Sequence, residues 1–462
     1  MARQKTAILI LAAGKGTRMQ SALPKVLHPL GGQPLIGYAL AAAKALKPDL
    51  GVVVIGPDMK AVADAVAPWP TVVQKTQAGT GDAVRAAKKR LSGFTGDVLI
   101  LFGDTPFLTP ATLRKLLARR RAKSKPAVVV LGMRPADPGE YGRLVTDARG
   151  TLEAIVEYRE ADEKTRKILL CNSGVMVVDG KHLFRLLSRV KKSSVKGEFY
   201  LTDLVAIARK EGLSCACVEG DAGELLGIND RADLAEAEAL FQLERRAVAM
   251  AKGVTLLDPT TVWFSFDTKL GRDITIGPNV FFGPGVRVAD GAVIRAFSHI
   301  EGARIGKGAI VGPFARLRPG ADLGEGAHIG NFVEVKKAKI GAGAKANHLA
   351  YIGDARIGSG ANVGAGTITC NYDGFTKSET VIGKDAFIGS NTSLVAPVTI
   401  GDGAIVGAGS VITKNVSRDA LALTRAAGKE IKGWARRHRA KNTAGRNAAD
   451  RNTAGRKKKT KG

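Results

Sequence analysis

The chain has 462 residues, 45% of them hydrophobic, so it is long enough for two domains with buried cores. It carries 70 Lys and Arg against 42 Asp and Glu, and the formal net charge of +28 favours polyanionic ligands. The four cysteines, Cys171, Cys215, Cys217 and Cys370, form neither a disulfide framework nor metal-ligand spacing. No apolar run approaches the length of a transmembrane helix, and we expect a cytoplasmic protein with reduced thiols.

The first half of the chain alternates apolar runs with helical patterns. Strands are predicted at Ala7–Leu11, Val52–Ile55, Val98–Phe102, Ala127–Leu131 and Val175–Val178. Helices are predicted at Ile36–Leu46, Asp82–Leu91 and Pro110–Arg121. This alternation indicates an α/β domain with a mostly parallel sheet, in which ligands bind at the carboxyl ends of the strands. The run Thr6–Ala13 could be read as a signal peptide, but a buried strand explains it, since a glycine-rich loop follows directly.

That loop has the composition of a phosphate-binding turn. Leu11-Ala12-Ala13-Gly14-Lys15-Gly16-Thr17-Arg18-Met19 follows the first predicted strand, and its backbone N–H groups can surround phosphate oxygens. Met19 stands where the dinucleotide-binding fingerprint has its third glycine, and the Walker pattern does not fit either. Together with Arg18 and the following Pro24-Lys25, the turn becomes a distinct pattern.

The second half is organised around a repeat of six residues. Arg231–Lys252 has apolar residues at helical spacing and predicts a helix that joins two domains; the repeat is expected to begin after Pro259. The repeated aliphatic or aromatic positions form three runs: Ile276, Phe282, Val288, Ile294, Ile300; then Ile305, Val311, Leu317, Leu323, Ile329, Val335; then Ile382, Ile388, Leu394, Ile400, Val406, Ile412. A period of six fits neither a helix nor a lone amphipathic strand and indicates a hexapeptide β-helix. A glycine-rich β-sandwich, the alternative, does not explain a register kept over so many repeats.

The most specific motifs resemble a known family. Leu11–Met19 and Leu23-Pro24-Lys25-Val26-Leu27 resemble the signature of sugar-1-phosphate nucleotidylyltransferases. With the hexapeptide array, the chain resembles the bifunctional bacterial N-acetylglucosamine-1-phosphate uridylyltransferase/glucosamine-1-phosphate N-acetyltransferases over residues 5–435. The resemblance implies a Rossmann-like α/β nucleotidyltransferase domain at 1–230, a linker helix at 231–252 and a left-handed parallel β-helix at 253–435. A basic tail that we expect to be disordered would occupy 436–462.

The resemblance also implies roles for residues of the first domain. The residues that would bind UTP and the UDP-sugar are Leu11, Ala12, Ala13, Gly14, Arg18, Lys25, Gln74, Gln77, Gly79, Thr80, Gly81, Gly142, Glu157, Asn172 and Asn229. Asp104 and Asn229 would bind Mg²⁺, the expected cofactor. The alternatives are a solvated surface charge for Arg18 or Lys25, a turn or helix cap for Asp104, and a cap of the next helix for Asn229, which is compatible with metal binding.

In the second domain, polar residues gather where the register of six falters. By resemblance, His348 is the general base of acetyl transfer; a lone histidine is more often structural, but its setting in Asn347–Asp354 favours catalysis. The residues that would bind the sugar phosphate are Arg318, Lys336, Tyr351 and Asn362. The residues that would bind acetyl-CoA are Asn371, Tyr372, Ser390, Ala408 and Arg425. Gly374–Lys377 is predicted to project from the coil as a loop.

The implied function is a two-step synthesis of UDP-N-acetylglucosamine, a precursor of the bacterial cell envelope. The β-helix would acetylate glucosamine-1-phosphate with acetyl-CoA, and the first domain would then transfer UMP from UTP with release of pyrophosphate. One alternative is a single-activity nucleotidylyltransferase whose β-helix only regulates or assembles; His348 and Lys336 argue against it. The other is a non-catalytic scaffold with a degenerate transferase domain; the argument against it is the presence of Arg18, Lys25, Asp104 and Asn229.

The remaining expectations concern partners. The segment Asn442–Arg446 recurs as Asn452–Arg456 and three lysines follow, a composition too polar to fold alone. We favour a solvated tail, with a nucleic-acid contact as the alternative. The flat faces of a solenoid and the family resemblance imply a homotrimer that acts on small molecules without a membrane. Because His348 and Arg425 lie several coils apart, we expect each acetyl site to take them from different subunits.

Overall fold

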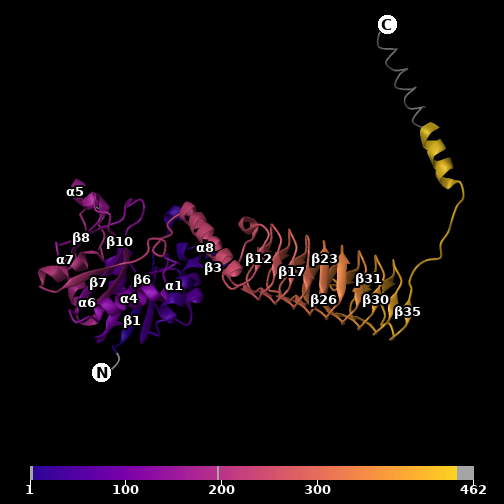
Figure 1. Ribbon diagram of the computed structural model, residues 1–462, viewed down its shortest axis with the longest axis horizontal. Helices are drawn as coiled ribbons and strands as arrows, with labels where there is room; N and C mark the ends of the chain where they lie inside the picture. The colour runs from indigo at the N-terminus through magenta and orange to yellow at the C-terminus, as the bar shows by residue number, and fades with distance from the viewer. Residues whose placement is uncertain (1–3, 195–196, 445–462) are drawn as a thin grey trace, which may run out of the picture. The chain divides into compact units, whose positions relative to one another are not determined.

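The computed structural model describes residues 4–194 and 197–444. Two compact units divide between Phe332 and Val333, inside the predicted β-helix, and the predicted domain limits stay predictions. Within the described residues, no helix combines the length and the apolar character that crossing a bilayer requires. Figure 1 traces the chain from the α/β elements at its N-terminus to the coils of short strands that follow.

The first unit begins with a sheet in the order β11-β7-β10-β6-β1-β4-β5, to which the hairpin β8–β9 is attached. Its strands are β1 (Thr6–Ala12), β4 (Leu50–Ile55), β5 (Thr71–Val73), β6 (Asp97–Phe102), β7 (Val128–Met133), β8 (Arg143–Thr146), β9 (Leu152–Val156), β10 (Cys171–Asp179) and β11 (Cys215–Glu219). Along this order neighbouring strands are parallel, except that β10 runs antiparallel to β6 and β7. The predicted α/β class with a mostly parallel sheet is confirmed.

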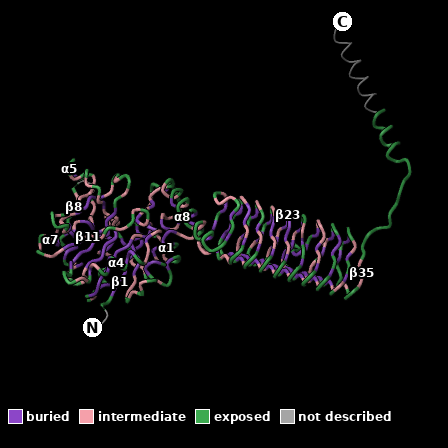
Figure 2. The backbone as a smooth tube through the Cα atoms, in the orientation of Figure 1, coloured by how far each residue is buried: buried purple, intermediate pink, exposed green. Residues whose placement is uncertain are grey.

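Alternating residues of β1 show why the strand is apolar from Ala7 to Ala12. Leu9 belongs to the core on one face of the sheet, whereas Ile8 and Ile10 belong to the core on the other. Side chains of a strand point to opposite faces in turn, so a sheet covered on both faces needs apolar residues at every position. In Figure 2 buried residues fill the interior of this α/β domain.

Helices cover both faces. Residues of α3, α6 and α7 contribute to one core, and residues of α1, α2 and α4 contribute to the other. The α-helices of the unit are α1 (Leu35–Lys44), α2 (Lys60–Val66), α3 (Thr80–Ala86), α4 (Pro110–Arg120), α5 (Glu163–Arg166), α6 (Gly180–Ser188), α7 (Asp203–Lys210) and α8 (Arg231–Ala251). The predicted helix Asp82–Leu91 ends earlier, at Ala86, because the backbone then changes to tighter bonds such as Lys88 N–H to the Arg85 carbonyl.

Helix α8 is the predicted joining helix, and it is packed against the α/β domain. Phe241 of α8 lies in a small core with Leu30 and Leu35. The turn between β2 (Pro29–Leu30) and β3 (Gln33–Pro34) also holds the helix, since Gly31 N–H donates to Glu238 Oε2 at 2.8 Å. The carbonyl of Gly31 accepts from Phe266 N at 2.8 Å, which ties the segment after α8 to the same turn.

The hexapeptide coils of the first unit begin before the predicted position. Strand β12 (Thr255–Leu256) already pairs with β14 (Thr275–Ile276), so the repeat begins ahead of Pro259. The other strands are β13 (Lys269–Leu270), β15 (Phe281–Phe282), β16 (Arg287–Val288), β17 (Val293–Ile294), β18 (His299–Ile300), β19 (Arg304–Ile305), β20 (Ile310–Val311), β21 (Arg316–Leu317), β22 (Asp322–Leu323) and β23 (His328–Asn331). Every third strand pairs in parallel, so that Ile276 stands opposite Ile294, 18 residues later.

The predicted slip in the register is visible as a coil that is one residue shorter. Val288 pairs with Ile305, 17 residues later, while its inward side chain keeps its stack. The repeated positions are buried, as a parallel β-helix requires of its inward residues. The predicted fold class of hexapeptide repeats in parallel strands, consistent with a left-handed β-helix, is therefore confirmed.

The second unit continues the same pattern in its own coils. Its strands are β24 (Glu334–Ile340), β25 (Lys345–His348), β26 (Tyr351–Ile357), β27 (Asn362–Val363), β28 (Ile368–Cys370), β29 (Thr380–Ile382), β30 (Phe387–Ile388), β31 (Ser393–Val395), β32 (Val398–Ile400), β33 (Ile405–Val406), β34 (Val411–Ile412) and β35 (Leu421–Ala422). Ile357 pairs with Ile382, 25 residues later, whereas Ile382 pairs with Ile400 after 18. The extra residues of the longer coil form the predicted loop, whose tip at Phe375 is 94% exposed.

After β35 the described chain has little regular structure until residues 434–444, which are helical and exposed. Trp434 and His438 stack there with ring centroids 4.7 Å apart. The rest of the tail for which we expected disorder, residues 445–462, lies outside the described residues.

Candidate functional site

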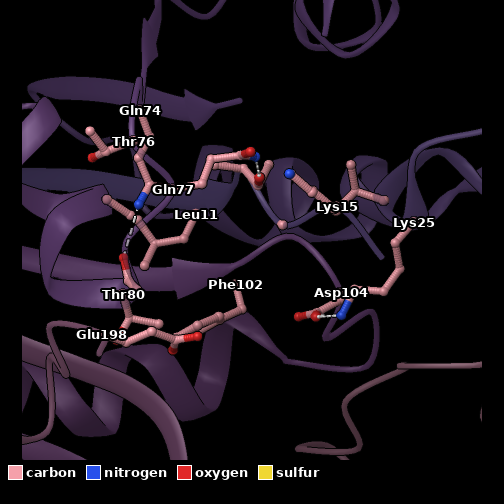
Figure 3. A pocket seen from close by; sticks show the side chains of 16 residues that line it. Leu11, Lys15, Lys25, Gln74, Thr76, Gln77, Thr80, Phe102, Asp104 and Glu198 are labelled. Carbon is pink, nitrogen blue, oxygen red and sulfur yellow. Dashed lines mark hydrogen bonds and ion pairs between the residues drawn. The ribbon is translucent and has the colours of Figure 1, made fainter. Parts of the chain in front are cut away.

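A cavity of about 480 Å³ lies at the carboxyl ends of β1 and β6, where an α/β sheet of this kind binds ligands. Its lining is Leu11, Ala12, Ala13, Gly14, Lys15, Lys25, Val26, Gln74, Thr76, Gln77, Gly79, Thr80, Ala83, Phe102, Asp104 and Glu198 (Figure 3). The glycine-rich turn and the glutamine segment predicted to bind UTP thus line one space, although they are far apart in the sequence.

The phosphate loop is packed directly against the segment that carries Lys25. Gly16 has φ +62°, and a side chain there would bring its Cβ to 2.6 Å from Cβ of Lys25. Only glycine permits this approach, so the loop and η2 (Lys25–Leu27) are held together. Gln77 fixes the loop from across the cavity, because its Nε2 donates to the carbonyl of Ala13.

A second set of hydrogen bonds shapes the far wall around Asp82. Its carboxylate accepts from Gln74 Nε2 at 2.9 Å and from Thr76 Oγ1 at 2.7 Å. Burial opposes the charge, yet these bonds hold the pKa of Asp82 below its ordinary value. Gly79 begins α3 at φ +98°, where a Cβ would lie 2.7 Å from the carbonyl of Phe199, so the glycine in this predicted segment is a steric requirement.

Three residues predicted from separate motifs meet at the end of β6. Nζ of Lys25 forms an ion pair with the carboxylate of Asp104 and lies 3.3 Å from Oδ1 of Asn229. The Lys25 and Asp104 side chains are 13% and 18% exposed, so Lys25 is not the solvated surface charge of the alternative reading. The cap of α8 is Asp230, whose carboxylate accepts from Ala232 and Asp233 N–H, so the capping alternative for Asn229 also falls.

The predicted sugar-binding residues form a cluster of their own. Asn172 N–H donates to the carbonyl of Gly142 at 2.8 Å, and Oε2 of Glu157 would be 3.6 Å from a Cβ at Gly142. Thr202 Oγ1 donates to Glu157 Oε1 at 2.9 Å, which orients that carboxylate. This cluster, Gly81 and Asn229 do not belong to the lining of the cavity, and neither does Arg18, which is exposed.

Several lining residues were missed by the sequence reasoning. Lys15 lies within the predicted phosphate loop and Thr76 lies between Gln74 and Gln77, so these neighbouring motif residues could have identified them. Phe102 ends the predicted strand that precedes Asp104. Glu198 has no such signal, because it reaches the cavity from a distant segment that Phe199 N–H anchors to the carbonyl of Ala78 at 2.8 Å.

Four of the predicted acetyl-transfer residues, Lys336, His348, Tyr351 and Asn362, lie in neighbouring coils of the second unit. Lys336 in β24 pairs with Gly353 in β26, two residues beyond Tyr351. Asn362 in β27 pairs with Lys345, at the start of the strand that ends with His348. Arg318 follows β21 and therefore belongs to the first unit.

The predicted acetyl-CoA residues continue along later coils. Asn371 is buried, and its Nδ2 donates to the carboxylate of Asp354 in the preceding coil, while Tyr372 starts the projecting loop and is 58% exposed. The carbonyl of Ser390 accepts from Gly409 N at 2.8 Å, so Ser390 adjoins the coil that carries Ala408. Arg425 closes the series, since a Cβ at Gly409 would lie 3.9 Å from its Cδ.

Comparisons with known proteins agree with this two-part layout. Residues 8–177 match the MobA-like NTP transferase domain, and residues 302–337 and 379–414 match the bacterial transferase hexapeptide family. A solved UDP-glucose pyrophosphorylase complexed with UDP-glucose covers 52% of this chain and 100% of that chain, with 18% identity and a TM-score of 0.44, too low to add to the assignment.

Curated relatives match nearly the whole chain. The bifunctional protein GlmU of Paramagnetospirillum magneticum is 61% identical over 96% of this chain and 99% of the relative. The bifunctional proteins GlmU of Rhodospirillum rubrum and Sphingopyxis alaskensis are 59% and 56% identical over 94% and 93% of this chain, and over 98% and 96% of their own lengths. The predicted family and its bifunctional transferase activity are confirmed at this level of identity. This chain belongs to the family of bifunctional GlmU proteins.

Proposed function

We propose that the cavity at the ends of β1 and β6 is where UMP is transferred from UTP to N-acetylglucosamine-1-phosphate. The observation that carries the proposal is the meeting of Lys25, Asp104 and Asn229 beside the phosphate loop. In this reaction an oxygen of the sugar phosphate attacks the α-phosphorus of UTP, and pyrophosphate leaves. The protein must hold the groups in line and neutralise charge, which the loop N–H groups and the ammonium of Lys25 can do.

The donor set near Asp104 fits a magnesium ion that arrives with the nucleotide. One carboxylate and the amide oxygen of Asn229 are hard oxygen ligands, and phosphates and waters would supply the others. Among the described residues, no three His, Cys, Asp or Glu side chains gather as a metal cluster, so an all-protein cage is not indicated. When bound, the ion would supply charge for the phosphate oxygens, and Asp104 and Asn229 would position it.

For the acetyl transfer, we propose that His348 is the general base. The amine of glucosamine-1-phosphate must lose its proton before it can attack the thioester, and an imidazole titrates in the required range. His348 stands at the end of β25, and its carbonyl accepts from Gly366 N–H of the next coil at 3.4 Å. Lys336, Tyr351 and Asn362 in the adjoining strands support the proposal, since they can bind a phosphorylated sugar.

We also propose that a homotrimer completes each acetyl site in the cytoplasm. Backbone hydrogen bonds join successive coils: Gly366 N–H donates to the carbonyl of His348, Asn391 N–H to that of Ala365, and Gly409 N–H to that of Ser390. Arg425 lies against Gly409 in the following coil, so about four coil spacings separate it from His348. At about 4.8 Å per coil, the two residues are roughly 19 Å apart along the axis. One acetyl group therefore cannot touch both in a single subunit, and a neighbour would supply one of them.

Mixed subunits test the shared site. His348→Ala and Arg425→Ala proteins carrying different tags are unfolded together and refolded, and the doubly tagged oligomer is isolated. We expect acetyl transfer to reappear at part of the parental rate, because some sites then hold both native residues. Mixed oligomers that are no more active than either variant would contradict the shared site.

Substrate omission tests the two reactions. The protein is incubated with acetyl-CoA, glucosamine-1-phosphate, UTP and Mg²⁺, each left out in turn, and the sugar products are identified by mass spectrometry. We expect UDP-N-acetylglucosamine only from the full mixture, and N-acetylglucosamine-1-phosphate when UTP is omitted. EDTA should stop pyrophosphate release and spare CoA release. An acetyl transfer that collapses with EDTA and returns with Mg²⁺ would contradict His348 as an unaided base.

A further inference from the structure

The ammonium of Lys25 lies on the two oxygens that the proposed function assigns to a divalent cation. Its Nζ donates to a carboxylate oxygen of Asp104 and, at 3.3 Å, to Oδ1 of Asn229. We propose that Lys25 is a resident counter-ion of the metal site, which keeps divalent cations off the nucleotide-free protein and moves to phosphate oxygens when UTP enters. The inference rests on the proposed function, because it takes Asp104 and Asn229 as the metal's ligands.

The two acceptor oxygens are held in place by other bonds. Nδ2 of Asn229 donates to the carbonyl of Gly227 at 3.3 Å, and the backbone N–H of Asn229 donates to Asp233 Oδ2 at 2.8 Å. This arrangement directs Oδ1 toward Lys25. The carbonyl of Asp104 accepts from Ile228 N–H at 3.0 Å, so the end of β6 is tied to the segment that carries Asn229. A cation at this place therefore meets both oxygens without rearrangement of the backbone.

The Cβ end of the Lys25 side chain is fixed by packing, whereas its ammonium is held only by contacts that it can exchange. Its Cβ lies against Gly16 of the phosphate loop, while its ammonium reaches back to Asp104 (Figure 3). Rotation about the side-chain bonds of Lys25 can move the ammonium between the carboxylate and the space above the loop. The side chains of Lys25 and Asp104 are only 13% and 18% exposed, so solvent and salt screen their attraction weakly.

An ammonium and a divalent cation compete for these oxygens. Nζ of Lys25 contacts one carboxylate oxygen of Asp104, and two positive charges at contact distance repel each other in a partly buried site. The apparent affinity for the metal is reduced by the fraction of molecules in which Lys25 holds the site. UTP lowers the fraction of molecules in which Lys25 holds the site, because the phosphate oxygens of UTP offer the ammonium another partner. Metal and nucleotide binding are therefore coupled, and the coupling is reciprocal.

The test measures Mn²⁺ binding to the full-length protein without nucleotide, from the electron paramagnetic resonance signal of free Mn²⁺. The variant is Lys25→Met, and the matched control is Lys15→Met. Lys15 lines the same cavity with the same charge, but it lies away from Asp104 (Figure 3). If Lys25 holds the oxygens in about nine-tenths of the molecules, Lys25→Met binds Mn²⁺ about tenfold more tightly. Lys15→Met should change the affinity less, and UTP should tighten Mn²⁺ binding in the parent more than in Lys25→Met.

The outcomes separate this inference from the function on which it rests. If the parent binds Mn²⁺ with UTP but Lys25→Met binds Mn²⁺ alone no more tightly than the parent, the counter-ion role is wrong and the metal site stands. If Asp104→Asn leaves Mn²⁺ binding with UTP unchanged, the metal assignment itself is wrong, and the inference falls with it. Circular dichroism checks that each variant folds. Lys25→Arg, which keeps the charge, should stay near the parent. If Lys25→Met does not fold, Lys25→Gln, which also removes the charge, takes its place, and an unchanged Mn²⁺ affinity in that variant would overturn the counter-ion role.

Discussion

Replacement of Asp104 by alanine should abolish one activity and spare the other. Asp104 is a partner of Lys25 at the end of β6, while His348 and its neighbours lie in the second unit. Removing a single preorganised electrostatic group from a transferase site costs about 10²–10³ in kcat, or about 3–4 kcal/mol. The loss here should reach at least that size, since the metal would lose its carboxylate ligand as well.

The same change has a cost in stability that the structure lets us estimate. Breaking a fully buried ion pair by removing one partner costs about 3–5 kcal/mol. The Lys25 and Asp104 side chains keep 13% and 18% of their exposure, so water can partly solvate the remaining ammonium. Asn229 Oδ1 also stays within 3.3 Å of Nζ. We therefore expect a loss of about 1–3 kcal/mol in the free energy of unfolding.

The assays follow each reaction by itself. Pyrophosphate release from UTP and N-acetylglucosamine-1-phosphate reports uridylyl transfer, and free CoA thiol from acetyl-CoA and glucosamine-1-phosphate reports acetyl transfer. Urea unfolding gives the stability. The double variant Lys25→Met/Asp104→Ala removes the unpaired cation, and it should recover stability but not uridylyl transfer. A folded Asp104→Ala protein that loses both activities equally, or keeps uridylyl transfer, would refute the reasoning.

Other predictions concern titration, thiols and the tail. Burial and the nearby Arg231 lower the pKa of His28 below 6.5, so below that pH the unfolded chain binds more protons than the folded protein. The contribution of His28 to stability is therefore full above about pH 6.5 and falls as the pH is lowered. Urea unfolding from pH 5 to 8 should show this slope, and His28→Gln should flatten it. Burial raises the pKa of Cys215 and Cys217 to about 12 and about 11, so a thiol reagent at pH 8 should label Cys370 first, and Cys370→Ser should remove the fast phase. Truncation after Ala440 should leave both activities near normal, because the described residues 423–444 beyond the last coil are exposed; loss of acetyl transfer would reveal a role for the tail.

The sequence by itself determined the β-helix architecture, because the inward-facing residues of a β-helix recur at a fixed spacing. Inward positions such as Ile276 and Ile294 recur every sixth residue, and only a solenoid of short strands buries such a pattern. The fully apolar run of β1 likewise required a sheet covered on both faces. The phosphate loop was recognisable for a local reason, since its glycines are needed where the chain turns and packs closely.

Only the tertiary structure decided which groups touch. Lys25 meets Asp104 and Asn229 across 79 and 204 residues of sequence, and no local pattern encodes such a contact. The antiparallel direction of β10 and the entry of Glu198 into the cavity also depend on connections between distant elements. The spacing of apolar residues shows which side chains face inward, because each buried position by itself requires an apolar residue. The position of an ammonium between two oxygens depends on the packing of whole segments, and it becomes visible only when the chain is folded.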